Sequence, residues 1–578
     1  MRLLLSYIKP YKKYFLSAAA VVIISSGAIL AFGRGLSALI DDGLFGGDAG
    51  VWPLIWVFLL TLVIATGSYL RLWLCGMGAE FVIRDLRRRL YDKIVSLSPS
   101  VLETTSTSLL MSRLMADTAA LHSILSGSVL FIFRNITVFL SSVGMLIYTN
   151  FLLTVRIVWV VPLLLLIVAF LGKRVKRAGV FSRMRKDALA HFSEETCRGL
   201  KVIQSLVAEK RVQQKFSCLL EEVSDSESKY VVLRALLVTL IIASVAGSVG
   251  VVLWIGIKAV AEHDMSGGAL LSFVFYSALA AGSVNGLGDN MHDLQKAVGI
   301  SEDIDALLNM PSSINDASEC KDVYEIKGSV DINDVTFAYA GKKEIPVLKG
   351  ISLSMKKGEK IAIVGYSGSG KSTIVDLLLR FYDVGSGSIT IDGVDIRQIS
   401  LRSLRTLFCV VSQSPVIFSG TILDNITYGI HDYTEEQLNH AIEGASIADF
   451  INELPNKIHT FVGEKGVCLS EGQKQRIVVA RTILRRPEVL ILDEATSALD
   501  SDNEDKVYRA LRELMRDKLT ITVAHRLATI VDSDKIVVLH DGVIQEVGTH
   551  ATLMQDDDSL YARLFKLQCK VGAGSTSI

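Results

Sequence analysis

The stretch GYSGSGKST, residues 365–373, is a complete G-x-x-x-x-G-K-[ST] loop. The apolar run 361–364 precedes it and the periodic segment 374–382 follows it, so the pattern predicts a strand, a phosphate-binding loop and a helix. Glycines let backbone amides point at anionic oxygens, Lys371 adds a positive charge, and the hydroxyl of Ser372 can bind Mg²⁺. A chance glycine-serine turn is the alternative, and the strand and helix signals on both sides argue against it. The loop therefore predicts a nucleotide site.

A second element of phosphate chemistry is the run VLILDE, residues 489–494. An acid at the carboxyl end of a buried strand can bind the Mg²⁺ of a nucleotide, which is the role expected of Asp493. The next acid, Glu494, can polarise a water for attack on the γ-phosphate. The same two acids could instead interact with the dipole at the start of a helix. Together with the loop at Lys371, they favour nucleotide hydrolysis.

The composition indicates a chain of several domains that is partly embedded in lipid. It has 578 residues, of which 50% are hydrophobic, and a mean hydropathy of +0.41, which is high for a soluble protein. Its 60 basic residues balance 60 acidic ones, so nucleic acid is not expected as a partner. The 7 cysteines are scattered without a C-x-x-C spacing, which is typical of reduced thiols rather than disulfides or zinc ligands.

Apolar stretches in the first half predict helices that cross the ~30 Å hydrocarbon core of a membrane. The six expected spans are residues 14–32, 51–75, 124–148, 151–171, 231–257 and 269–288. Basic residues concentrate in the long connections after the second and fourth spans, so the positive-inside rule places both termini and these two loops in the cytoplasm. Segments 79–97 and 185–207 have helical periodicity, which predicts that the membrane helices continue beyond the lipid. A small separate domain in each loop is the alternative.

From about residue 301 the composition becomes that of a soluble α/β domain. Strand-like and helical patterns interleave there, the strands at 330–337, 388–391, 489–492, 519–523 and 536–539 and the helices at 434–443 and 503–515. We therefore expect an all-α six-helix transmembrane domain followed by an α/β P-loop NTPase domain. The expected boundaries are a transmembrane domain at 1–310, a linker at 311–328, a nucleotide domain at 329–570 and a flexible tail at 571–578.

In their order and spacing, these motifs resemble the ATP-binding cassette (ABC) family over the whole chain. Tyr339 resembles the aromatic residue that stacks on adenine, Gln413 the Q-loop glutamine, LSEGQ at 469–473 the signature, Asp500 the end of the D-loop, and His525 the switch histidine. On composition alone, Tyr339 could be an ordinary strand residue, Gln413 a solvated loop residue and His525 a structural histidine. The ATP contacts that the resemblance implies are Tyr339, Gly365, Tyr366, Ser367, Gly368, Ser369, Gly370, Lys371, Ser372, Thr373, Ser470, Gly472, Gln473, Asp493 and Asp500.

The resemblance also implies ATP and Mg²⁺ as cofactors and a second half-transporter as partner. Mg²⁺ would be held by Ser372, Gln413 and Asp493, and Glu494, His525 and Gln413 would be catalytic. In the family, ATP lies between the signature of one copy and the phosphate loop of another, which implies a dimer. A homodimer is expected and a heterodimer stays open.

The signature departs from the family's LSGGQ because Glu471 occupies its third position. A carboxylate close to the γ-phosphate would repel it unless the side chain points outward. We expect a working site, and a degenerate site in a heterodimer stays open.

Polar residues inside the expected spans are candidates for a substrate cavity, namely Arg71, Arg134, Asn135 and Asn285. Because ionisable groups are costly in lipid, such arginines suit an anionic amphiphile, while snorkelling near helix ends is the alternative. The membrane half resembles lipid A flippases of the MsbA type and multidrug exporters of the bacterial inner membrane. This implies an ATP-driven exporter or flippase that moves a lipid or hydrophobic substrate out of the cytoplasmic leaflet by alternating access.

Two rival classes remain. A nucleotide-gated channel or signalling regulator would share the architecture. A soluble cassette ATPase would share the nucleotide motifs, and the six apolar spans argue against it.

Overall fold

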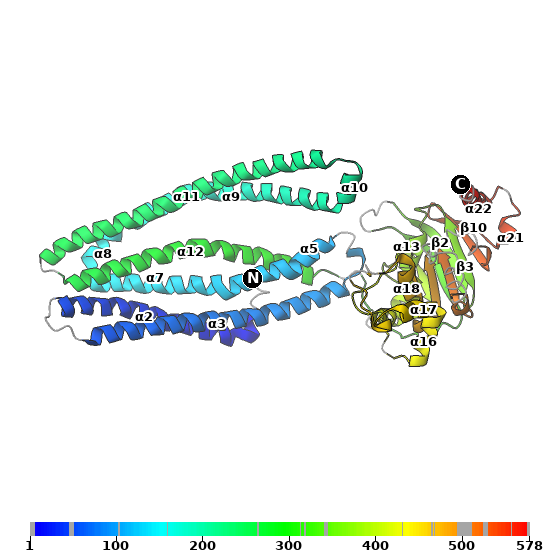
Figure 1. Ribbon diagram of the computed structural model, residues 1–578, viewed down its shortest axis with the longest axis horizontal. Helices are drawn as coiled ribbons and strands as arrows, with labels where there is room; N and C mark the ends of the chain where they lie inside the picture. The colour runs from blue at the N-terminus through cyan, green and yellow to red at the C-terminus, as the bar shows by residue number, and fades with distance from the viewer. Residues whose placement is uncertain are drawn as a thin grey trace. The chain divides into compact units, whose positions relative to one another are not determined.

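The computed structural model of the protein (Figure 1) places long helices in the first half of the chain and two β-sheets in the second half. It describes residues 6–574, except for 45–50, 102–104, 159, 263–264, 312–313, 317–319, 340–344, 431, 464–465, 467–468, 494–510, 524–529 and 557. The chain divides into two compact units, Met1–Lys93 with Leu110–Met310 and Ile94–Leu109 with Pro311–Ile578. The domain boundaries expected from the sequence stay a prediction.

The first unit is built of helices. Its longer elements are α2 (Lys12–Leu44), α3 (Val51–Ser96), α7 (Val129–Thr149), α8 (Phe151–Val158), α9 (Val160–Arg198), α10 (Leu200–Ser205), α11 (Glu209–Ala261) and α12 (Gly267–Leu308). Among the described residues, 5 helical stretches are long and apolar enough to cross a membrane: Ser6–Asp41, Leu54–Ser96, Thr107–Thr149, Glu209–Lys258 and Gly267–Val284. The remaining expected span, 151–171, includes Trp159, which lies outside the described residues, with α8 before it and α9 after it.

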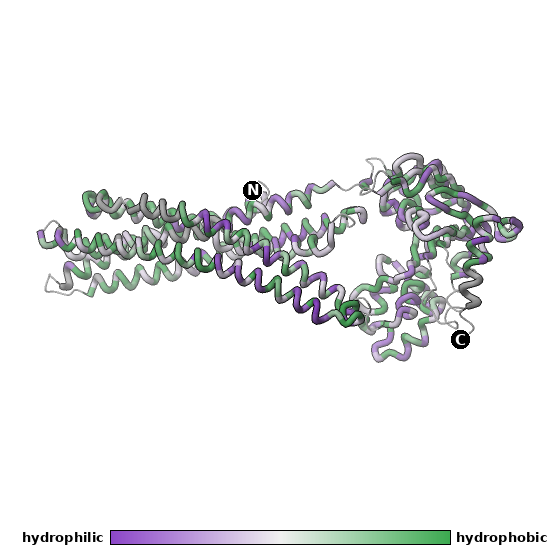
Figure 2. Tube along the Cα trace, turned by 90° about the horizontal axis from the view of Figure 1, so that it is seen from above, coloured by the Kyte–Doolittle hydropathy of each residue, from purple (hydrophilic) through white to green (hydrophobic). Residues whose placement is uncertain are grey.

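The membrane helices continue through the two polar loops, as the sequence predicts. Helix α3 is 46 residues long, α9 is 39 and α11 is 53, so helical backbone replaces the alternative of small separate domains. Helices α9 and α11 lie side by side (Figure 1) and are joined by ion pairs, Arg185 to Glu222 at 2.6 Å and Lys186 to Glu227 at 2.8 Å. Toward their α10 ends, this helix pair shows more hydrophilic colour (Figure 2), in agreement with segments that leave the lipid.

The helical stretch Thr107–Thr149 contains two π-helical segments, η2 (Arg113–Asp117) and η3 (Ile124–Ser128). Such segments are rare and rotate the side chains that follow them around the helix axis. Residues of both reach α12: Arg113 donates to the carbonyl oxygen of Asp303 at 2.5 Å, and Ser128 donates to Oδ2 of Asp293 at 2.6 Å. The π segments thus lie where this stretch is tied to the last helix of the unit.

The second unit contains the two sheets. The larger sheet has the order β10-β9-β3-β8-β7-β6, in which neighbouring strands are parallel except for β10 and β9. Its strands are β3 (Lys360–Gly365), β6 (Phe408–Val411), β7 (Val489–Asp493), β8 (Leu519–Val523), β9 (Lys535–His540) and β10 (Val543–Gly548). The smaller sheet is antiparallel, with the order β2-β1-β4-β5 and the strands β1 (Ser329–Phe337), β2 (Leu348–Lys356), β4 (Ser386–Ile391) and β5 (Val394–Asp395). The α/β class and the five expected strands are confirmed.

Helices cover these sheets. They include α13 (Lys371–Leu378), α14 (Leu401–Leu407), α15 (Ile422–Ile426), α16 (Glu435–Gly444), α17 (Ala448–Glu453), α18 (Glu471–Arg485), α21 (His550–Leu553) and α22 (Leu560–Gly574). Because successive strand residues face opposite sides, β3 packs in two directions. Ile361 and Ile363 join a core with α13 and the antiparallel sheet, whereas Ala362 and Val364 pack with Tyr561 of α22. Strand β3 therefore delivers its loop from the centre of a layered core.

Candidate functional site

The phosphate loop, residues 365–373, connects β3 to α13. Gly370 is the N-cap of α13 and has φ +103°, and a Cβ at this position would lie 2.6 Å from Cδ2 of Leu348. Gly368 also has a positive φ, +81°, but nothing lies within 4 Å of a Cβ there. Residue 370 must therefore be glycine for two reasons, backbone conformation and lack of space.

The interior of the loop has the chemistry of an anion site. Lys371 is only 7% exposed, and its ammonium donates to the carbonyl oxygens of Gly365 and Tyr366, each at 2.9 Å. Among the described residues, the Oγ atom of Ser369 is buried without a hydrogen-bond partner. Gly370 at the N-cap of α13 has no side chain, and the described part of the chain gives this helix no cap, so its first N–H groups and the positive end of its dipole are available to a ligand. These groups fit the phosphates of a nucleotide.

Parallel register brings the expected Mg²⁺ ligands to the same sheet edge as the loop. Asp493 of β7 pairs with Val523 of β8, and Ile363 of β3 pairs with the same valine from the other side. Asp493 therefore lies level with the end of β3. Strand β6 pairs with β7 through Val411, so Gln413, two residues later, leaves from the same edge. Ser372 is exposed at the start of α13. Their hydroxyl, amide and carboxylate oxygens are of the kind that Mg²⁺ prefers.

Tyr339 lies beside the phosphate loop. Its hydroxyl is 3.0 Å from Oγ1 of Thr373, and its ring meets the rings of Phe337 and Tyr382 edge to face, with centroids 5.0 Å and 5.2 Å apart. These contacts position the side chain next to α13. Stacking on adenine stays a prediction.

One neighbour of the loop was not expected from the sequence. Tyr366 is 45% exposed, and its ring centroid lies 5.8 Å from that of His540. Because Gly365 pairs with Leu539 in parallel register, His540 is level with Tyr366. The histidine that directly follows the predicted strand 536–539 is the signal that could have identified this neighbour.

The signature motif begins helix α18 with a capping box. The Ser470 hydroxyl accepts from the amide of Gln473 at 3.2 Å, and Oε1 of Gln473 accepts from the amide of Ser470 at 2.9 Å. Glu471 is 60% exposed, and its Oε1 lies 2.9 Å from Nζ of Lys474, whose side chain is 16% exposed. The extra carboxylate of this signature is thus paired with a cation on its own helix.

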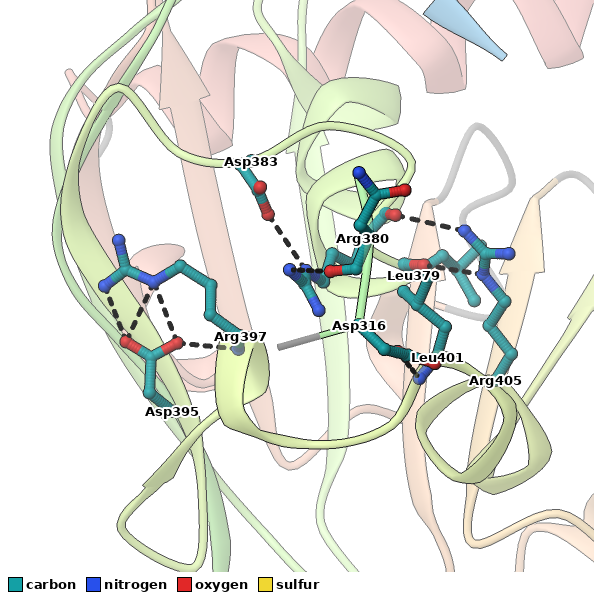
Figure 3. A network of polar contacts seen from close by, with 9 residues as sticks. Asp316, Leu379, Arg380, Asp383, Asp395, Arg397, Leu401 and Arg405 are labelled. Atoms are coloured by element: carbon teal, nitrogen blue, oxygen red, sulfur yellow. Dashed lines mark hydrogen bonds and ion pairs between the residues drawn. The ribbon is translucent and has the colours of Figure 1, made fainter. Parts of the chain in front are cut away.

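The far ends of α13 and α18 meet at Arg405, whose contacts with the end of α13 are shown in Figure 3. Arg405 donates to the carbonyl oxygens of Leu379 and Arg380, at 3.3 Å and 3.2 Å, where they follow α13. Arg485, the last residue of α18, donates to the carbonyl oxygen of Arg405 at 2.8 Å. Burial, followed by the nearby charge of Arg380, lowers the pKa of Arg405. Sequence reasoning missed this link, because a basic residue that caps a distant helix has no local pattern.

Helix α13 is shorter than the periodic segment 374–382 predicts, because it ends at Leu378. Arg380 adopts the left-handed conformation, with φ +51°, which cannot continue the helix. Its side chain is held by Oδ1 of Asp383, at 2.9 Å, and by the carbonyl oxygen of Asn315, at 3.2 Å (Figure 3). These contacts tie the end of the helix to the segment that was expected to be a linker.

Several predicted site residues are not placed by the structure. Glu494, Asp500 and His525 lie outside the described residues, as does the side chain of Asn285. The other cavity candidates lie on α3 (Arg71) and α7 (Arg134 and Asn135). Asn135 is 6% exposed, and in the described part of the chain its Nδ2 has no hydrogen-bond partner. The substrate cavity stays a prediction.

Comparison with known proteins agrees with this site. Residues 13–284 match the family described as "ABC transporter transmembrane region", and residues 348–497 match the family described as "ABC transporter". The chain is 32% identical over 569 residues to the "ATP-dependent lipid A-core flippase" of Pseudoalteromonas translucida, with 98% of this chain and 97% of that protein covered. It is 35% identical over 523 residues to "ABC transporter B family member 1" of Dictyostelium discoideum, with 88% of this chain and 56% of that protein covered.

A solved structure has the same fold. The "structure of a bacterial Atm1-family ABC exporter with ATP bound" superposes with a TM-score of 0.82 and 25% identity, with 96% of this chain and 99% of that chain covered. The similarity therefore extends over both the helical half and the α/β half.

Proposed function

The chain belongs to the ABC transporter family as an exporter-type half-transporter that couples ATP hydrolysis to transport, and we propose that it moves a lipid or amphipathic substrate out of the cytoplasmic leaflet. One observation carries the proposal. The chain that holds the uncapped, glycine-shaped phosphate loop at Lys371 also contains helices long and apolar enough to span a membrane. It is an integral membrane protein, and we place it in a bacterial inner membrane with both termini in the cytoplasm.

We assign the nucleotide chemistry as follows. Lys371 and the loop amides bind the phosphates, and Tyr339 contacts the adenine. Ser372, Gln413 and Asp493 hold Mg²⁺, which supplies charge neutralisation on the β- and γ-phosphates when bound. Glu494 orients the attacking water, and His525 holds the γ-phosphate end of the site.

Dimerisation completes the site in this proposal. Ser470, Gly472 and Gln473 of one copy would close over the nucleotide on Lys371 of the other copy, next to Asp500. A homodimer satisfies this with one gene product. Closure and reopening of the paired nucleotide domains would alternate the access of the membrane half.

For the substrate, relatives named as lipid A-core flippases support a lipid-linked saccharide, and a hydrophobic drug is the other exporter cargo. Arg71, Arg134, Asn135 and Asn285 are our candidates for the cavity. Arginines at membrane depth suit a phosphate-bearing amphiphile better than a cationic drug.

Reconstitution of the full-length protein tests the proposal. ATP-dependent flipping should be measured in proteoliposomes with a lipid A-type glycolipid and, in parallel, a cationic drug. Glu494→Gln should bind ATP and abolish turnover, because the water loses its orienting carboxylate. Flipping by Glu494→Gln at the wild-type rate, or ion currents without hydrolysis-dependent transport, would contradict the proposal.

A further inference from the structure

A cluster of four cations marks the membrane end of helix α9. Lys173, Arg174, Lys176 and Arg177 follow directly on the apolar run 160–171, and all four are exposed. At 1.5 Å per residue they occupy about 6 Å along the helix axis, which is the thickness of one headgroup layer. With residues 151–171 as a membrane span, as the sequence predicts, the cluster would lie at the level of the lipid phosphates.

These cations differ from those farther along the same helix. Arg185 and Lys186 are each paired with an acid of α11, at 2.6 Å and 2.8 Å, and Arg198 is paired with Glu194 at 2.6 Å. Among the described residues, no ion pair involves Lys173, Lys176 or Arg177. The guanidinium carbon of Arg174 lies over the ring of Phe170, 4.7 Å from its centroid. The charge of the cluster is left uncompensated by the neighbouring helix.

Helix α11 adds a further cation rather than an acid. Gly179 of α9 lies against Tyr230, and Ser182 donates to Glu227, which fixes the antiparallel register of the pair. Arg234 lies one turn after Tyr230 on α11, so this register brings it level with residues 173–177 of α9. After Glu227 the sequence of α11 has no acid up to its end at Ala261. At this level the sequence of α11 therefore offers the cluster no acid to pair with.

The cluster borders a hollow in the surface of α9. The hollow has a volume of about 450 Å³ and is lined by Lys173, Lys176, Arg177, Val180, Phe181 and Met184. Its apolar side chains are exposed, Phe181 by 52% and Met184 by 64%. An apolar wall beside cations lowers the local dielectric constant and strengthens their attraction for an anion. A plain solvated face of lysines and arginines would lack this wall.

We propose that the cationic hollow of α9, formed by Lys173, Lys176, Arg177 and their apolar neighbours, binds the phosphate headgroup of an anionic membrane lipid. The acyl chains of that lipid would lie in the bilayer along the apolar segment 160–171, while the phosphate meets the cations. Charge complementarity and the position at the end of a span favour a lipid over a soluble anion. This lipid site does not depend on the proposed transport activity.

The test uses the full-length protein in neutral detergent, titrated with lipid and followed by native mass spectrometry. The probes are phosphatidylglycerol, phosphatidylcholine with the same acyl chains, and glycerol 3-phosphate as the soluble source of the same chemistry. The variant is K176Q/R177Q. Its matched control is K186Q/R198Q, which removes one lysine and one arginine from the same helix where acids already pair with them.

Wild-type protein should prefer phosphatidylglycerol to phosphatidylcholine. K176Q/R177Q should lose about thirtyfold in phosphatidylglycerol affinity, and K186Q/R198Q should stay within about twofold of wild type. Equal binding of the two lipids by wild type, or equal losses in both double variants, would overturn the proposal. Glycerol 3-phosphate binding as tight as that of phosphatidylglycerol would show a free-anion site and overturn it as well.

Two measurements on wild-type protein complete the test. The preference for phosphatidylglycerol should fall steeply as salt rises from about 0.05 to about 0.5 M, because salt screens exposed charges. This measurement does not depend on the folding of any variant. A preference that salt does not change would overturn the proposal. ATP hydrolysis by the same preparation is measured in parallel. Lipid selectivity without hydrolysis would contradict the proposed function and leave the lipid site standing.

Discussion

Helices α13 and α18 of the nucleotide domain begin in opposite ways. Helix α13 starts after Gly370 with no side-chain cap, whereas α18 starts after Ser470 with a complete capping box. The first amides of α13 therefore need an external acceptor, which a phosphate can supply. In α18 the amide of Gln473 already has an acceptor inside the chain, the hydroxyl of Ser470. The comparison indicates that most of the phosphate affinity of one copy comes from α13.

The largest expected effect comes from the charge inside the α13 loop. Lys371→Ala should weaken ATP binding by about 1000-fold, because a nearly buried ammonium is lost from the phosphate site. Isothermal titration calorimetry on the full-length protein measures this. Lys349→Ala, an exposed lysine of strand β2, is the control and should bind ATP as wild type does. Unchanged ATP affinity in Lys371→Ala would show that the start of α13 does not supply most of the phosphate affinity.

The next effect concerns the shape of the loop. Gly370→Ala should lower ATP affinity by about 100-fold, because both the left-handed backbone and contact with Leu348 oppose a methyl group. Gly368→Ala is the matched variant, with a positive φ but open space, and should lose only about tenfold. If the two variants behave alike in the same titration, crowding at residue 370 contributes nothing.

A smaller effect is expected from the cap of α18. Ser470→Ala and Thr434→Ala each remove the hydroxyl of a capping box, the second on α16, and each should destabilise its helix start by about 1 kcal/mol. Hydrogen exchange of the first-turn amides measures this cost. Only Ser470→Ala should also slow ATP hydrolysis. Equal hydrolysis rates in the two variants would show that the signature serine acts as a cap alone.

The smallest effect is expected from Glu471, the residue that replaces the glycine of the family's LSGGQ signature. Glu471→Gln should change the KM for ATP by less than about threefold, because the carboxylate is exposed and paired with Lys474. Steady-state hydrolysis at several salt concentrations provides the measurement. A KM for ATP that falls tenfold or more in Glu471→Gln would mean that the carboxylate faces the phosphate in the closed dimer and repels it.

Sequence reasoning anticipated the elements whose signals are local. The strand, loop and start of α13 follow from glycine positions and an apolar run, and the continuity of α3, α9 and α11 follows from helical periodicity. Contacts between distant segments escaped it. The bonds from Arg405 to the end of α13 join residues 25 and 26 positions apart, and His540 reaches the loop only through sheet order. The early end of α13 depends on the left-handed Arg380, which no propensity rule assigns to arginine.

The 53 residues of α11 correspond to about 80 Å of helix, and they contain no proline. Its first part, residues 209–231, is braced by α9 through ion pairs and has neither glycine nor proline, so it should move as a rigid rod. Movement of this arm is therefore expected as a tilt about its start, near Ala208, and about the glycines at 247 and 250. Local reshaping of the helical unit is cheaper in the stretch with π turns, η2 and η3, because their hydrogen-bonding pattern is already irregular.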